Sequence, residues 1–315
     1  MTLQTQSLPL RHDHLDSLAI ASLLLCCALW GLNQIAIKVA LPEVPSLVQL
    51  SIRSGVAALC LLGWMWRRGV SFSLRDGTFW PGLLAGALFA SEFACVFIAL
   101  QHTSAARSVV FINTSPFVVA LLLAALLPGE RLRPVQLGGL LLAFGAIAQA
   151  FGEGFGSGGA AGHGPAAWQG DALMLLAAVL WGLTTVTIRL SALRSAPAEK
   201  TLAYQLVVAA LLAPLGALLT GEHWPSGVAG LSWLTLGSLF YQAVIVTFAS
   251  YLLWFWLLTR YPATKVQAFV FLSPVFGTLF AGLLLSEPVT PRLLLGLLGV
   301  GVGLALVNRR PAAAT

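Results

Sequence analysis

Residues 28–41 read ALWGLNQIAIKVAL, and residues 179–192 read VLWGLTTVTIRLSA. The Trp-Gly-Leu of the first stretch returns in the second, and Lys38 in the first corresponds to Arg189 in the second. Each stretch lies in an apolar run that is long enough to form a membrane-spanning helix. A polar pattern that returns about 150 residues later on the same kind of helix indicates a duplicated membrane unit.

A second motif is repeated farther along each half of the chain. In both copies a Ser-Pro pair precedes a glutamate, and a proline and a glycine follow that glutamate after four and nine residues. The copies are Ser115-Pro116 with Glu130, Pro134 and Gly139, and Ser273-Pro274 with Glu287, Pro291 and Gly296. The two halves of the chain therefore share one plan.

The composition is that of a membrane protein. Hydrophobic residues make up 58% of the chain and charged residues 9%, whereas charged residues make up about a quarter of an ordinary soluble domain. Apolar runs that can cross about 30 Å of hydrocarbon lie at 17–39, 45–65, 79–101, 104–127, 134–152, 170–191, 201–220, 231–258, 263–285 and 292–308. We therefore expect an all-α membrane protein with ten transmembrane helices, five in each copy.

An odd number of spans in each copy has a consequence for topology, because the second copy then enters the membrane from the opposite side. The predicted fold is two inverted five-helix repeats around a central cavity. The predicted organisation is a cytoplasmic leader (1–16), a first repeat (17–152), a glycine-rich outer linker (153–169), a second repeat (170–308) and a cytoplasmic tail (309–315).

The distribution of basic residues predicts the orientation. With a cytoplasmic N-terminus, thirteen of the seventeen Lys and Arg residues lie inside, and the four outside are Lys38, Arg53, Arg107 and Arg292. This bias predicts a multi-pass plasma-membrane protein, in the inner membrane if the cell is bacterial, with both termini cytoplasmic. The basic residues form no run interleaved with aromatic residues, so we expect no nucleic-acid partner.

Polar side chains at membrane depth are the candidate site, because each is costly in hydrocarbon and must face protein or water. Trp30 lies near the middle of its span, with Asn33 and Gln34 three and four residues on; Trp181 and Thr185 are spaced alike in the second copy. We favour cavity lining over simple helix contacts for these two faces.

Glu92 lies near the centre of the third span. Its carboxyl group has two alternative roles, which the sequence does not separate. It either contacts a substrate amine or exchanges a proton during transport, or it is a neutral structural acid bonded to a neighbouring backbone group.

Further candidates lie on the spans that surround the predicted cavity. The eighth span carries Tyr241, Gln242, Ser250 and Tyr251, and the fourth carries Asn113 and Thr114. Pro116 and Pro274 predict kinks at matched positions, with hinge motion as the functional alternative. For Arg53 we favour snorkelling to the outer interface over contact with a substrate. Glycines of the last span allow close packing within the chain or between two copies.

These motifs together resemble the EamA repeat of the ten-helix drug/metabolite transporter superfamily. The resemblance rests on the Trp-Gly stretch, the lysine eight residues on, the arginine in the second span, Ser-Ala-Ala-Arg at 104–107, Ala-Thr-Lys at 263–265 and the two Glu-Pro-Gly motifs. It implies an exporter of small metabolites, often amino acids, with a cavity lined mainly by spans 1, 3, 4, 6, 8 and 9. Two departures are Ser286-Glu287-Pro288 in place of Gly-Glu-Arg, and Gln205 in place of an arginine.

The expected function is a secondary transporter or facilitator that exports amino acids by alternating access to a central site. We expect a small-molecule substrate and the lipid bilayer as partners, with coupling to protons left open, and a monomer or a homodimer. No cofactor and no metal site are expected. The alternatives are efflux of lipophilic cationic drugs and, from another class, a polytopic membrane enzyme that uses Glu92 as acid or base.

The predicted topology can be tested with two single cysteines. A cysteine at Ser157 should react with an impermeant maleimide in intact cells, and a cysteine at Arg194 should react only after permeabilisation. Labelling of both positions from the same side would contradict the inverted repeat.

Overall fold

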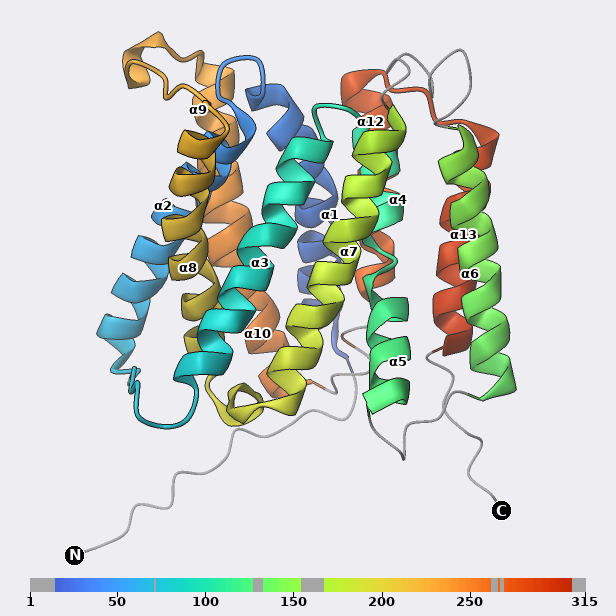
Figure 1. Cartoon of the computed structure of the whole chain (residues 1–315), viewed down its shortest axis with the longest axis horizontal. Coiled ribbons are helices and arrows are strands. Elements are labelled where there is room, and N and C mark those ends of the chain that lie inside the picture. The colour runs from blue at the N-terminus through green and yellow to red at the C-terminus, as the bar shows by residue number, and fades with distance from the viewer. Residues whose placement is uncertain are drawn as a thin grey trace, which may run out of the picture.

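The computed structural model describes residues 15–70, 72–126, 133–153, 167–261, 266 and 269–307. Within these ranges the secondary structure is entirely helical, and the helices run side by side in one bundle (Figure 1). The longer helices are α1 (Ser17–Ala40), α2 (Ser46–Arg68), α3 (Phe79–Ala99), α4 (Ala105–Ile112), α5 (Ser115–Leu126), α6 (Pro134–Glu153), α7 (Ala167–Leu190), α8 (Ala198–Leu219), α9 (Trp233–Phe240), α10 (Tyr251–Arg260), α12 (Ser273–Leu285) and α13 (Pro291–Val307). A π-helix, η4 (Tyr241–Ser250), joins α9 to α10, and short 3-10 turns are η2 (Ala192–Ser195), η3 (Val228–Gly230) and η5 (Val270–Leu272).

These described helices make up ten spans, as predicted. The fourth span consists of α4 and α5, the eighth of α9, η4 and α10, and the ninth of η5 and α12. Seven described segments are long and apolar enough to cross a membrane, and three shorter apolar helices complete the set. The helix α1 starts at the lower face in Figure 1 and its repeat counterpart α7 starts at the upper face, so the second repeat is inverted. Glu130, Ser157, the 263–265 motif and most of the predicted leader, linker and tail lie outside the described residues.

Local sequence sets the ends of several helices. Asp16 caps α1 by accepting a hydrogen bond from the amide of Ala19 at 2.8 Å, and Ser104 caps α4 in the same way, from Arg107 at 3.0 Å. Gly69 ends α2 with a φ of 65°, a left-handed conformation that glycine adopts without steric cost. The boundaries of these helices therefore follow from capping residues that the sequence shows directly.

The two repeated prolines mark breaks at matched positions. The helix α4 ends at Ile112, and α5 begins at Ser115, one residue before Pro116. In the second copy η5 ends at Leu272, and α12 begins one residue before Pro274. A proline in the first turn needs no amide partner, so each break places the proline where it costs least. The predicted kinks are thus present, and hinge motion stays a prediction.

The eighth span departs from the regular helix that its sequence predicts. Residues Tyr241–Ser250 form a π-helix, in which the hydroxyl of Thr247 donates to the carbonyl of Gln242 at 2.7 Å, five residues back. Long π-helices are rare, and π-helical turns are frequently found at functional sites. This segment carries much of the polar side-chain chemistry described below.

Small residues let two pairs of helices approach closely across the two halves of the chain. A Cβ atom on Gly31 of α1 would lie 2.6 Å from the amide nitrogen of Gly277 in α12. A Cβ atom on Gly303 of α13 would lie 2.5 Å from the carbonyl oxygen of Gly139 in α6. The glycines of the last span are therefore used for packing within the chain.

Substitution at two glycines of α13 tests this packing. Gly303→Ala should destabilise the fold by about 1–3 kcal/mol, because the new methyl group meets the backbone of α6. Gly301 has open space where its Cβ would lie, so Gly301→Ala should be neutral or stabilise by up to about 1 kcal/mol. Melting temperatures in detergent compare the two variants, and equal stability would show that α6 and α13 do not pack this closely.

Candidate functional site

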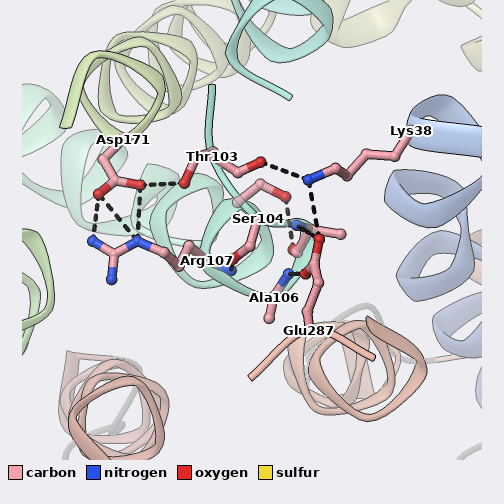
Figure 2. A network of polar contacts seen from close by, with 9 residues as sticks. Lys38, Thr103, Ser104, Ala106, Arg107, Asp171 and Glu287 are labelled. Carbon is pink, nitrogen blue, oxygen red and sulfur yellow. Dashed lines mark hydrogen bonds and ion pairs between the residues drawn. The ribbon is translucent and has the colours of Figure 1, made fainter. Parts of the chain in front are cut away.

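A network of charged groups ties together one end of the bundle (Figure 2). The carboxylate of Glu287, just after α12, accepts hydrogen bonds from the amides of Ala105 and Ala106 at 3.0 Å each. The ammonium group of Lys38 in α1 donates to Glu287 Oε1 at 3.0 Å and to the carbonyl of Thr103 at 2.9 Å. A carboxylate at the positive end of α4 is favourable, and the lysine compensates the rest of its charge. We call these contacts the Lys38–Glu287 clasp.

A second ion pair adjoins the clasp. The guanidinium group of Arg107 in α4 forms a bidentate pair with Asp171, the fifth residue of α7, and Arg107 Nη2 also donates to the carbonyl of Ala150 at 2.7 Å. The hydroxyl of Thr103 donates to the same aspartate at 2.6 Å. Two halves of the chain are thus joined at this end by buried, compensated charges. Asp171 was not among the expected site residues, although an acidic residue beside a predicted span end is a visible signal.

At mid-depth, an aromatic group joins the first span to the eighth. The indole Nε1 of Trp30 donates to the hydroxyl of Ser250 at 2.9 Å. The Trp30 ring also meets the rings of Tyr251 and Trp254 edge to face, with centroids 6.2 and 5.1 Å apart. The predicted need of a mid-depth indole for a partner inside the bundle is met here by the π-helix.

Arg53 lies in the same region, and the expectation that it snorkels to the interface is wrong. Arg53 is only 1% exposed. The Nε atom donates to the hydroxyl of Thr247 at 2.6 Å, and the guanidinium carbon lies 3.9 Å from the centre of the Phe93 ring. Neither Nη1 nor Nη2 has a hydrogen-bond partner among the described residues. A contact with the π-helix, which the sequence does not reveal, holds this side chain inside.

Glu92 completes the group on α3. It is 5% exposed, and its charge is close enough to interact with the Arg53 guanidinium. No hydrogen bond or ion pair of Glu92 is found within the described ranges. The Tyr251 hydroxyl lies near the Arg53 guanidinium, within electrostatic range and close enough to contribute a weak hydrogen bond. We call Trp30, Arg53, Glu92, Thr247 and Tyr251 the central polar cluster.

Two buried glutamine side chains, Gln49 and Gln242, adjoin this cluster and are linked by a hydrogen bond. Gln242 Nε2 donates to Ser238 Oγ at 3.1 Å and to Gln49 Oε1 at 3.2 Å, and Gln49 lies one helical turn before Arg53 on α2. Three buried carbonyl oxygens, Asn33 Oδ1, Gln34 Oε1 and Gln242 Oε1, lack a hydrogen-bond partner in the part of the chain described. Such acceptors are costly to bury unless a ligand or water completes them.

The other predicted site residues lie elsewhere or bond locally. The hydroxyl of Tyr241 donates to the carbonyl of Leu29 at 2.7 Å and so fastens η4 to α1. Asn113 and Thr114 bond back to carbonyl groups of α4 at the proline break. Trp181 is 37% exposed, and Thr185 donates to its carbonyl oxygen at 3.0 Å. The first-copy and second-copy tryptophans, matched in sequence, are therefore not equivalent in their surroundings.

The opposite end of the bundle has its own ion pair. Lys200 at the start of α8 donates to Asp76 Oδ2 and to the carbonyl of Ser73, both at 2.5 Å. Hydrogen bonds from Lys200 and then Thr78 lower the pKa of Asp76 to about 2, so this carboxylate is ionised at neutral pH. It links the loop between α2 and α3 to α8.

Two other kinds of site receive little support. An apolar cavity of about 400 Å³ lies between the outer parts of α2 and α9, and none of the central polar cluster lines it. Among the described residues no group of three or more His, Cys, Asp or Glu side chains could hold a metal ion. The central polar cluster therefore remains the candidate site.

Comparison with known proteins agrees with this architecture. The EamA-like transporter family model matches the chain twice, at residues 17–151 and 168–309. An uncharacterized transporter of Archaeoglobus fulgidus is 28% identical over 272 residues, which cover 84% of this chain and 88% of that protein. A probable amino-acid metabolite efflux pump of Escherichia coli K12 is 28% identical over 290 residues, which cover 89% of this chain and 91% of the pump. One crystal structure has a TM-score of 0.62 at 20% identity over 93% of this chain and 97% of its own, and thus shares the fold.

A duplicated bundle of ten spans with charged groups buried at mid-depth is the architecture of a membrane transporter. The chain belongs to the EamA-like transporter family, and it is a multi-pass integral membrane protein. The expected resemblance is confirmed.

Removal of one charge tests the Lys38–Glu287 clasp. Glu287→Gln should lower stability by about 2–4 kcal/mol, because it leaves the lysine uncompensated and supplies one acceptor oxygen in place of two. Glu43→Gln is a suitable control, since Glu43 is exposed and accepts one amide hydrogen bond, from Ser232 at 2.7 Å. Melting temperatures that fall equally in both variants would contradict a special role for the clasp.

Proposed function

We propose that this protein is a secondary transporter or facilitator that exports amino acids or similar small metabolites across the plasma membrane. The observation that carries the proposal is the central polar cluster, in which helices of both repeats bring a buried guanidinium and a buried carboxylate together at mid-depth. Inverted-repeat transporters bind their substrates at this depth, at the interface between the repeats.

The chemistry of the cluster fits an amino acid. A zwitterion brings both a carboxylate and an ammonium group, and the cluster offers Arg53 for the first and Glu92 for the second. The edge-to-face rings of Trp30 and Tyr251 add apolar surface for a side chain. The name of the Escherichia coli relative, a probable amino-acid metabolite efflux pump, supports the same class of substrate.

Alternating access would use features at the two ends of the bundle. The Lys38–Glu287 clasp and the Arg107–Asp171 pair hold α1, α4, α7 and the end of α12 together on the side predicted to be outside. We propose that these contacts close the outer path in this conformation and separate when the site opens outward. The breaks before Pro116 and Pro274 would absorb the change in backbone angles.

The other candidate substrates fit less well. A lipophilic cation would gain from Glu92 but would be repelled by the neighbouring Arg53. Membership of a transporter family favours transport over the alternative of a membrane enzyme that uses Glu92 as acid or base. A cytoplasmic location of both termini, the two repeats at 17–152 and 170–308, and substrate contacts of Trp181, Thr185, Asn113 and Thr114 stay predictions.

Counterflow in proteoliposomes tests the proposal. Vesicles with wild-type protein, loaded with unlabelled L-leucine or L-phenylalanine, should accumulate the same labelled amino acid faster than protein-free vesicles. Glu92→Gln should slow this exchange at least about tenfold, because the neutral amide cannot form the charged hydrogen bond that we propose between Glu92 and the ammonium group of the substrate. Glu199→Gln, at the start of α8 and remote from the cluster, should have little effect.

Two other results would bear on the role of Glu92 and on the proposed function. If Glu92 exchanges a proton during the cycle, Glu92→Gln retains exchange and loses only the response to an imposed pH gradient. If wild-type vesicles exchange neither these two nor any of the other proteinogenic amino acids, amino-acid transport is the wrong function.

A further inference from the structure

The guanidinium group of Arg53 is buried with its hydrogen bonds incomplete. Arg53 is the eighth residue of α2, roughly 10 Å along the helix from its first residue at 1.5 Å per residue. One of its three nitrogens donates to Thr247, and the two terminal nitrogens have no partner among the described residues. A charge left in this state is costly at membrane depth, so an anionic partner is missing.

Two contacts hold the guanidinium in a fixed orientation. Thr247 accepts from Nε, and the guanidinium carbon lies over the Phe93 ring, 3.9 Å from its centre, and 5.7 Å from the centre of the Phe97 ring. Thr247 is itself fixed, because its hydroxyl donates to the carbonyl of Gln242 within the π-helix. The side of the guanidinium used by Nε is thus occupied. The Tyr251 hydroxyl also lies beside the guanidinium, close enough to contribute a weak hydrogen bond. Neither terminal nitrogen makes a well-formed hydrogen bond among the described residues, and these two nitrogens form the free edge.

The free edge has the geometry of a carboxylate site. Nη1 and Nη2 present parallel N–H groups that match the two oxygens of a carboxylate in a bidentate pair. Glu92 is the nearby acidic group, yet it forms no ion pair with Arg53 among the described residues. An internal carboxylate therefore does not complete the arginine in this conformation.

We propose that Arg53 binds the carboxylate of the substrate through Nη1 and Nη2, and that this transporter selects small molecules with a free carboxylate. The inference rests on the proposed function and names the substrate class for the same site. Thr247 is a positioning residue, because it acts on the substrate only through the orientation of Arg53.

Groups for the other end of a zwitterion are also present. Gln242 Oε1 lacks a partner and lies on the side chain that bonds Gln49, one turn from Arg53. Glu92 provides a carboxylate within electrostatic range of the same arginine. An α-ammonium group can donate to such acceptors while the carboxylate pairs with Arg53. A molecule that carries an amine alone satisfies these acceptors and leaves the guanidinium unpaired, so the site disfavours it.

Ligand series on the wild-type protein test the proposal without any substitution. Thermal stabilisation in detergent is measured with L-phenylalanine, 3-phenylpropionate, L-phenylalaninamide and phenethylamine, and with the corresponding four compounds of the L-leucine series. We expect both carboxylates of at least one series to stabilise the protein, and the amide and the amine to bind at least about tenfold more weakly. Equal stabilisation by the amide or amine, or none by any carboxylate, would overturn the proposal.

Variants assign the effect to Arg53. Arg53→Gln should weaken binding of the carboxylates at least about tenfold, and Arg53→Lys should give an intermediate loss, because it retains the charge without the fork. Arg68→Gln is the matched control, since Arg68 is on the same helix and also lies over an aromatic ring, 4.8 Å from the centre of Trp64. If Arg53→Gln does not fold, Arg53→Lys and the ligand series still decide.

The outcomes separate this proposal from the transport proposal. Carboxylate binding that depends on Arg53, without flux in vesicles, would reject transport of these molecules and retain the site. Amino-acid exchange by Arg53→Gln at the wild-type rate, or unchanged carboxylate affinity in that variant, would overturn the site and retain transport.

Discussion

The central constraint on this structure is that each polar group at membrane depth must find its partner inside the bundle. Hydrogen bonds within the helices satisfy the backbone N–H and C=O groups, so the constraint falls on the polar side chains. Trp30 and Arg53 meet this constraint through the eighth span, whose π-helix brings Ser250 and Thr247 to them. Gln242 of the same π-helix donates to Ser238, which lies one turn earlier in α9. The irregular helix and the central polar cluster are therefore one feature: widening of the helix places these oxygens where the first two spans need them.

The same constraint explains why three basic residues lie on the predicted outer side, against the general charge bias. Lys38 pairs with Glu287, Arg107 pairs with Asp171, and Arg53 bonds to Thr247. None of these three acts as a lipid-facing anchor. The first two are paired with carboxylates and join the halves of the chain, whereas the two terminal nitrogens of the third have no hydrogen-bond partner among the described residues. This difference is why we propose a closing role for the first two residues and a binding role for the third, although all three look alike in a hydropathy profile.

Duplication produced equivalent helices without producing equivalent sites. Trp30 is held among aromatic rings and Ser250, while its sequence counterpart Trp181 is partly exposed and has no such partners within the described residues. Arg53 likewise corresponds to Gln205, which is uncharged. The first repeat therefore supplies the charged groups of the central polar cluster, and the second repeat supplies the π-helix that orients them. A candidate site shared in this way is asymmetric even though the fold is an inverted repeat.

The sequence by itself determined the class of structure. Ten apolar runs, the doubled Trp-Gly and Ser-Pro motifs, and the capping residues fix the helices, their inverted order and the breaks at Pro116 and Pro274, because these depend on local chemistry and hydropathy. It also singled out Trp30, Glu92, Gln242, Ser250 and Tyr251 as polar groups at depth. Only the tertiary structure decided which of them meet, since helical periodicity gives a face and not its partner. The burial of Arg53, the pairing of Glu287 with Lys38 and the π-helix depend on contacts between residues about 200 or more apart in the chain, which no local pattern encodes.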